Sequence, residues 1–202
     1  MRVLGLDISS QSTGWAVLED GQLDKSCHHY GLIKMKHKTH GERLAYFDNE
    51  LHTIIVSYDV DMVAIEDVWA GKFILPSLIL SRYRGIAEKV CWERFKTEPL
   101  VRTATDFRKL LGLKYETNLL PGKKEKLATG KDSKELTFEL MCKVFDLKLD
   151  FEKDNDKTDA LAVSLAAYLL GTDFGQAVDA ETASKKASKK AKKAAARSKR
   201  KR

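Results

Sequence analysis

The sequence predicts an α/β fold, with a mixed five-stranded sheet flanked by helices. Three strand-like segments follow one another in the first 35 residues, and helix-like and strand-like segments alternate after them. The chain has 202 residues, of which 43% are hydrophobic, and this is enough for one compact domain with a sizeable core. We place that domain at residues 1–171 and interpret residues 172–202 as a disordered, basic Ala/Lys-rich tail.

The first three strands are predicted from apolar runs bounded by turn residues. The runs cover residues 2–8, 13–19 and 29–35. Asp20-Gly21 follows the second run, and this dipeptide is typical of a tight hairpin turn. We therefore expect the three strands to form an antiparallel meander.

Helices and two further strands are predicted after the meander. Apolar residues recur at helical spacing across residues 42–58. Residues 61–68 are apolar on both faces, which is typical of a strand covered on both sides. The remaining elements are a helix at 75–95, a short strand at 100–105, a short helix at 106–111, a loop-like segment at 112–130, and helices at 133–145 and 156–170.

The positive charge is concentrated at the C-terminus. From Lys185 to Arg202 there are eleven Lys and Arg and no acid, whereas residues 1–184 hold 25 basic against 29 acidic residues, a net charge of −4. Attraction to nucleic acid through bulk charge would therefore come mainly from the tail. The candidate DNA contacts in it are Lys185, Lys186, Lys189 and Lys190. A merely solubilising tail, or one that attracts acidic membranes or proteins, remains the alternative.

Cysteine usage and hydropathy bear on the setting of the protein. The three cysteines are far apart and form no Cys-x-x-Cys pair, so we expect neither a disulfide framework nor a cysteine zinc site. No apolar run approaches the roughly 20 residues of a membrane helix, and no signal peptide is recognisable. These observations predict a reducing, cytoplasmic setting without a membrane partner.

Four carboxylates fall where an α/β sheet places functional groups. Asp7 and Glu66 each lie at the end of a predicted strand, and neighbouring strands would bring both to one edge. Asp156 and Asp159 are three residues apart at the start of the last helix, so they share one face. Clustered carboxylates repel one another unless cations neutralise them, and Mg²⁺ or Mn²⁺ are the natural partners. Each acid alone also fits a structural role as a turn former or helix cap.

The order of these acids resembles the RuvC group of Holliday-junction resolvases, which have a ribonuclease H-like fold. The resemblance rests on Gly5-Leu-Asp-Ile-Ser-Ser-Gln-Ser-Thr-Gly14, Ile65-Glu-Asp-Val68 and Asp156-x-x-Asp159-Ala-Leu-Ala162. It continues with Val68-Trp69-x-x-Lys72, Arg84-Gly-Ile-Ala87 and Gly130-Lys-Asp-Ser-Lys134. It covers roughly residues 1–171 and implies a ribonuclease H-like sheet.

The resemblance also implies an activity and a metal site. The activity is resolution of four-way DNA junctions by a homodimer, through metal-dependent paired nicks that leave 5′-phosphate and 3′-hydroxyl ends. Asp7, Glu66, Asp156 and Asp159 match the family's metal-binding acids, with two Mg²⁺ ions in each active site and Mn²⁺ as a substitute. One ion would activate the attacking water and the other would stabilise the leaving oxygen. Lys134 matches the family's catalytic lysine.

Several other side chains are candidate DNA contacts. Trp69 matches a family aromatic that acts at the junction centre, where an indole can stack on an unpaired base, and Phe73 is its rival. Lys72 belongs to the same motif, Lys131 competes with the matched lysine for its role, and Lys109 is a weaker candidate for phosphate contact. A core position for Trp69 and plain solvation for the lysines remain open.

Three departures from the family pattern leave alternatives open. The loop at 112–130 is long, the basic tail has no counterpart, and Asp154, assigned to the helix start, could replace Asp156 as a ligand. The alternatives are a broader branched-DNA nuclease, a ribonuclease H, a non-catalytic DNA-binding protein and, from the segment after Asp7, an actin-like or sugar-kinase ATPase. The helix at 75–95 is the candidate dimer interface. The expected host is a bacterial cell or a phage-infected cell.

Overall fold

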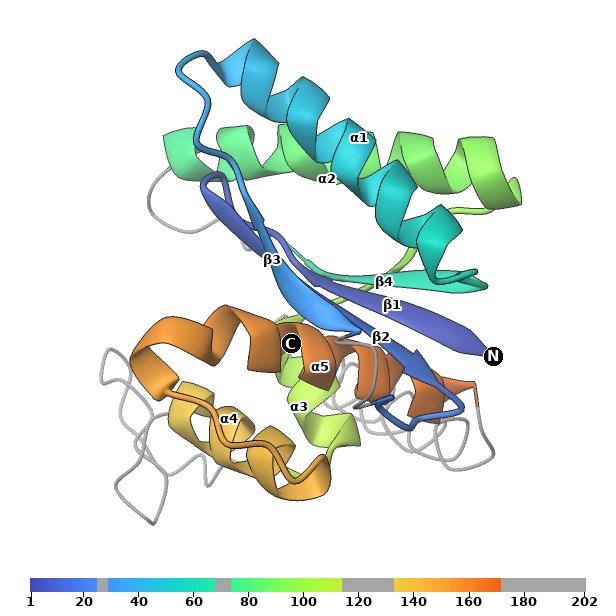
Figure 1. Cartoon of the computed structure of the whole chain (residues 1–202), viewed down its shortest axis with the longest axis vertical. Helices are drawn as coiled ribbons and strands as arrows, with labels where there is room; N and C mark the ends of the chain where they lie inside the picture. The colour runs from blue at the N-terminus through green and yellow to red at the C-terminus, as the bar shows by residue number, and fades with distance from the viewer. Residues whose placement is uncertain (25–28, 68–73, 114–132, 172–202) are drawn as a thin grey trace, which may run out of the picture. The chain divides into compact units, whose positions relative to one another are not determined.

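The computed structural model describes residues 1–24, 29–67, 74–113 and 133–171 (Figure 1). The chain divides into two units, Met1–Tyr168 and Leu169–Arg202, and the architecture described here is that of the first. None of the helices within the described residues is long and apolar enough to cross a membrane.

The described elements form a mixed sheet with helices on both faces. They are β1 (Arg2–Asp7), β2 (Ser12–Glu19), β3 (Tyr30–Lys34), α1 (His40–Ser57), β4 (Met62–Glu66), α2 (Ile74–Phe95), β5 (Leu100–Arg102), α3 (Ala104–Leu110), α4 (Ser133–Val144) and α5 (Phe151–Leu170). The strand order is β3-β2-β1-β4-β5, with β1, β2 and β3 antiparallel in sequence and β4 and β5 parallel to β1. The predicted fold class is confirmed.

The predicted turn after β2 is present. Asp20 and Gly21 both have positive φ, at 48° and 75°, the backbone combination of a type I′ turn. Glu19 and Gln22 exchange backbone hydrogen bonds of 3.0 and 2.8 Å across it. The chain then continues to β3, which pairs with β2 and completes the predicted meander.

Two apolar layers cover the sheet. Helices α1 and α2 lie on one face, and α3, α4 and α5 lie on the other (Figure 1). Phe47, Leu51 and Tyr83 are fully buried in the first layer, and Met141 and Leu161 are fully buried in the second. Burial of each such side chain contributes roughly 1.5–3 kcal/mol, so both faces of the sheet are held in place.

Two glycines let the backbone of α5 lie directly on the sheet. A Cβ on Gly5 would lie 2.3 Å from the carbonyl oxygen of Ala160, and one on Gly14 would lie 2.0 Å from that of Asp156. The hydroxyl of Ser164 donates a 2.6 Å hydrogen bond to the carbonyl oxygen of Val3. The position of α5 over β1 and β2 therefore depends on residues without side chains at two points.

The last helix begins earlier than predicted. It starts at Phe151 rather than Asp156, and the ring of Phe151 packs edge-on against Phe138 of α4 with centroids 5.3 Å apart. Asp154 lies in the first turn, as predicted, and accepts a 2.6 Å hydrogen bond from Lys157. Asp156 lies in the second turn, so its interpretation as a helix cap is wrong.

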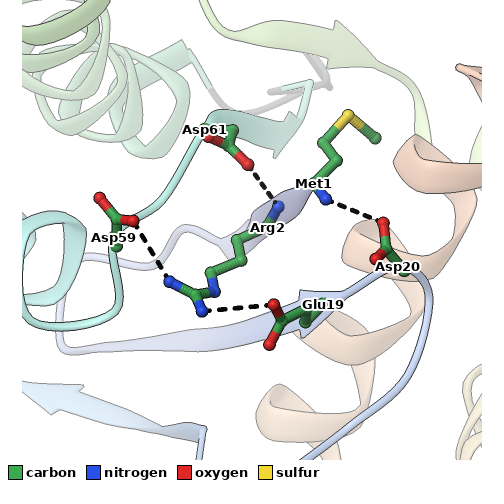
Figure 2. Close-up of polar contacts among 6 residues, drawn as sticks. All are labelled: Met1, Arg2, Glu19, Asp20, Asp59 and Asp61. Carbon is green, nitrogen blue, oxygen red and sulfur yellow. Dashed lines mark hydrogen bonds and ion pairs between the residues drawn. The ribbon is translucent and has the colours of Figure 1, made fainter.

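The end of the sheet opposite Asp7 is held by a group of polar contacts around Arg2 (Figure 2). The Arg2 guanidinium contacts Glu19 at 3.2 Å and Asp59 at 3.3 Å, and its backbone N–H donates a 2.7 Å hydrogen bond to Asp61. The ammonium of Met1 lies 2.8 Å from Asp20. These contacts are exposed and each contributes little alone, but together they join β1 to β2 and to the turn before β4.

Candidate active site

Two of the four predicted acids end neighbouring parallel strands. Leu6 of β1 pairs with Ile65 of β4, so Asp7 and Glu66, the next residue on each strand, emerge at the same edge of the sheet. This is the edge at which α/β sheets place their sites. The structure therefore brings together the two acids that are 59 residues apart in sequence.

The other two acids reach this edge on α5. Asp7 pairs with Gly14 of β2, and Gly14 lies directly beneath the backbone of Asp156. Asp159 follows one helical turn later and is only 6% exposed. Because α5 crosses the sheet at the level of Asp7, its two acids lie beside those of β1 and β4.

Three of these carboxyl groups, those of Asp7, Glu66 and Asp159, have raised pKa values. Burial, followed by the charges of Asp159 and Glu66, raises the pKa of Asp7 to about 8. Burial and the charge of Asp159 also raise the pKa of Glu66. Burial raises the pKa of Asp159, although Lys134 opposes that rise. Perturbed carboxyl groups gathered at one edge are typical of a functional site.

One predicted cation lies within this group of acids. The Lys134 ammonium, in the first turn of α4, is 3.2 Å from a carboxylate oxygen of Asp159. Burial lowers the pKa of Lys134, but the charges of Asp159 and Asp7 outweigh that effect and raise it. By contrast, Lys109 lies 3.6 Å from Asp106 on its own helix, so the structure does not bring it to the acids.

Arg108 is a second cation near the acids, and the sequence analysis missed it. Burial raises the pKa of Glu66 and of Asp159, and the positive charge of Arg108 opposes both rises, so Arg108 lies within electrostatic reach of both acids. It stands on α3, which follows β5, and β5 pairs with β4 as far as Glu66 and Arg102. The sequence held a signal for this position. A short helix that directly follows a strand paired beside Glu66 starts at the edge of the sheet that carries the acids.

The residue after Glu66 is fastened to α2. Asp67 forms an ion pair with Arg84, and Arg84 also contacts Glu88 at 2.8 Å. The backbone N–H of Asp67 donates a 2.8 Å hydrogen bond to the carbonyl oxygen of Arg102. These contacts hold the end of β4, and hence Glu66, in position between α2 and β5.

Comparison with known proteins shows which family this chain resembles. Residues 3–101 match the family model of the crossover junction endodeoxyribonuclease RuvC. The RuvC of Sulfurovum sp. (strain NBC37-1) is 26% identical over 166 residues, which cover 82% of this chain and 93% of that protein. The RuvC of Ehrlichia ruminantium (strain Gardel) is 34% identical over 90 residues, 43% of this chain and 56% of that protein. These matches show that the chain is similar to RuvC.

The fold of this chain agrees with its similarity to RuvC. The structure of T. thermophilus RuvC in complex with Holliday junction substrate superimposes with a TM-score of 0.64 and 14% sequence identity, over 85% of this chain and 94% of that one. A second Thermus thermophilus RuvC structure gives the same TM-score at 15% identity. The chain therefore has the ribonuclease H-like architecture that the resemblance predicts.

The acids of the RuvC-like site fit a hard divalent cation, and the RuvC family depends on divalent metal ions. All four donors are carboxylates, and the burial that raises the pKa of Asp7 is a cost that a divalent cation would offset. Within the described ranges, no group of three His, Cys, Asp or Glu side chains is already arranged to hold a metal ion.

The raised pKa values predict how the stability of the metal-free protein depends on pH. Asp7 holds its proton up to about pH 8 in the folded state but ionises near 3.8 when unfolded. The folded state thus binds more protons between these values, and the free energy of unfolding falls as the pH rises, by up to about 1.4 kcal/mol per pH unit for one such group. Urea unfolding in EDTA at pH 5 and pH 8 measures this slope. An Asp7→Asn variant with the same slope would contradict the assignment.

The other predicted contacts lie outside the described residues. They are Trp69, Lys72, Phe73, Lys131, Lys185, Lys186, Lys189 and Lys190.

Proposed function

We propose that this chain resolves four-way DNA junctions as a metal-dependent endonuclease, through paired nicks that leave 5′-phosphate and 3′-hydroxyl ends. The observation that carries the proposal is the gathering of Asp7, Glu66, Asp156 and Asp159 at one edge of a RuvC-like sheet. We place the protein in the cytoplasm of a bacterial or phage-infected cell, where such DNA occurs.

The acids would hold two Mg²⁺ ions, with Mn²⁺ as a substitute. When bound, these ions supply an activated water and charge stabilisation at the leaving 3′ oxygen. The carboxylates would hold the ions from three separate elements, β1, β4 and α5. Lys134 and Arg108 stand beside the acids and would contact the oxygens of the scissile phosphate, where positive charge stabilises the transition state.

Residues from the segment between β4 and α2 would act on the junction itself. We assign Trp69 or Phe73 to stacking on an unpaired base, an interaction worth roughly 1–3 kcal/mol. Lys72 of this segment would contact phosphates, and so would Lys131, which precedes α4 in the sequence. The motif that directly follows Glu66 supports the roles of Trp69, Phe73 and Lys72.

The dimer would form through α2. The first two turns of this helix expose apolar side chains, with 74% of Leu75 and 53% of Leu78 accessible. Further along, a Cβ on Gly85 would meet no atom within 4 Å, so a second helix could approach closely there. One active site cannot cut two strands together, and a two-fold dimer supplies two sites.

Replacing Leu78 with Lys is expected to convert the dimer into a monomer. The two-fold contact would bury two lysine charges, one from each protomer, in an apolar interface. Sedimentation or light scattering measures the mass, and paired nicks should become independent single nicks. Val144→Lys is the matched control, since Val144 is 49% exposed on α4. Unchanged mass for Leu78→Lys would exclude this face of α2.

Removal of residues 185–202 is expected to weaken binding to all DNA and to flatten its salt dependence, because the deleted segment carries +11. Cleavage at saturating protein should persist. Binding titrations at several salt concentrations measure the effect. Loss of cleavage with unchanged affinity would contradict this role for the tail.

The proposed activity is tested with labelled four-way junction, linear duplex and RNA–DNA hybrid, each with Mg²⁺, Mn²⁺ or EDTA. Paired symmetric nicks on the junction, absent in EDTA, are expected. Cutting of the hybrid alone would indicate a ribonuclease H, and cutting of every branched substrate a broader nuclease. Binding without cutting would indicate a non-catalytic protein, and ATP binding without nuclease activity an ATPase.

A further inference from the structure

Three lysines stand close together where β3 leads into α1. Lys34, Lys36 and Lys38 occur within five residues, and no acid lies among them. All three are exposed. We call these three residues the β3–α1 lysines. Their concentration contrasts with the net charge of −4 over residues 1–184.

The sheet places the first of these lysines on the same face as the acids. Asp7 pairs with Gly14, and α5 lies over Gly14 on that face. Ser12 is two residues from Gly14 and pairs with Lys34. Because alternate residues of a strand share a face and paired residues point the same way, Lys34 projects on the face that carries Asp7.

The neighbouring apolar residues hold this orientation. Ile33 and Met35 are 2% and 4% exposed and belong to the core under α1 and α2. The backbone N–H of Met35 donates a 2.9 Å hydrogen bond to the carbonyl oxygen of Gln11, so the pairing with β2 extends past the end of β3. Lys34 and Lys36, which alternate with these buried residues, are therefore held away from that core.

The distance from the acids suits a flanking phosphate. Lys34 is two strands across and two residues along from Asp7, which puts the two Cα atoms about 12 Å apart from standard strand spacings. A DNA strand carries one phosphate per ~3.4 Å of helix axis, so a span of about 12 Å along that axis corresponds to roughly three or four phosphates. The lysine side chains would reach the backbone of a strand that leaves the site over β2 and β3.

Within the described residues the β3–α1 lysines make no ion pair, whereas Lys89, Lys109 and Lys157 each contact an acid. A polyanion such as DNA is held best where unpaired positive charge lies close to the active site. We propose that Lys34, Lys36 and Lys38 form a DNA-backbone subsite that binds the phosphates beside the scissile one, on the β3 side of the active site. This inference rests on the proposed function.

The test measures junction binding across a salt series, in a full-length Asp7→Asn background that prevents cleavage. The test variant combines Lys34→Gln, Lys36→Gln and Lys38→Gln. The control variant removes three positive charges from exposed positions elsewhere, by Arg94→Gln, Lys143→Gln and Lys148→Gln. A third variant combines Lys34→Arg, Lys36→Arg and Lys38→Arg, which keep the positive charge.

The slope of log affinity against log salt is expected to become shallower by about two to three in the test variant. Its affinity near ~0.1 M salt should fall at least about tenfold. The slope of the control variant should change less than that of the test variant. The Arg variant should keep the slope of the unsubstituted chain, and this dependence on charge alone would not follow from a folding defect. Equal slopes for test and control overturn the subsite. If the unsubstituted chain neither binds nor cuts junctions, the proposed function fails and the subsite fails with it.

Discussion

Replacing Asp7 with Asn is expected to reduce junction cleavage by at least about a thousandfold, which corresponds to roughly 4 kcal/mol of transition-state stabilisation. Burial, followed by the charges of Asp159 and Glu66, raises the pKa of Asp7 to about 8. Its amide analogue keeps the shape but loses the negative charge that a divalent ion requires. Junction binding should stay within about threefold, because binding depends mainly on contacts to other phosphates.

Single-turnover cleavage of labelled junction, with binding measured in parallel, checks this result. Asp154→Asn is the matched control, since Asp154 lies on the same helix as two of the acids but is paired with Lys157. It should retain most of the cleavage. Full cleavage by Asp7→Asn would place the metal site elsewhere. Loss of cleavage in Asp154→Asn would make Asp154 a ligand.

The second large effect is expected from Gly14→Ala. The added methyl group would lie 2.0 Å from the carbonyl oxygen of Asp156 and 2.6 Å from its carbonyl carbon. Backbone atoms in a helix cannot turn aside as a flexible side chain can, so α5 must move or the sheet must distort. Overpacking of this kind typically costs 1–3 kcal/mol or more, and we expect cleavage to fall about a hundredfold, because Asp156 and Asp159 move with the helix.

Thermal unfolding and single-turnover cleavage measure the two parts of this prediction. Gly41→Ala is the matched control, because a Cβ at Gly41 in α1 would meet nothing within 4 Å. That substitution should leave cleavage unchanged and raise stability by up to about 1 kcal/mol through helix propensity. If Gly14→Ala were as stable and as active as this control, α5 would not lie on β2 as the structure shows.

The strands and most helices could be predicted from local patterns. Asp20-Gly21 identified its turn because both residues tolerate positive φ, and the apolar runs identified β1, β2 and β4. The start of α5 could not be predicted from local patterns, because residues 151–155 contain one apolar side chain, Phe151. Its contact with Phe138 on another helix extends α5 by a turn, and such a contact leaves no local trace.

The sequence by itself determined the fold class, the order of the acids and the resemblance to RuvC, because these depend on residue types and spacing along the chain. Only the tertiary structure decided which cations stand beside the acids. Arg108 and Lys109 are neighbours on α3, yet Arg108 acts on Glu66 and Asp159, while Lys109 contacts Asp106. The physical reason is that adjacent residues on a helix point about 100° apart, so the packing of α3 selects between them.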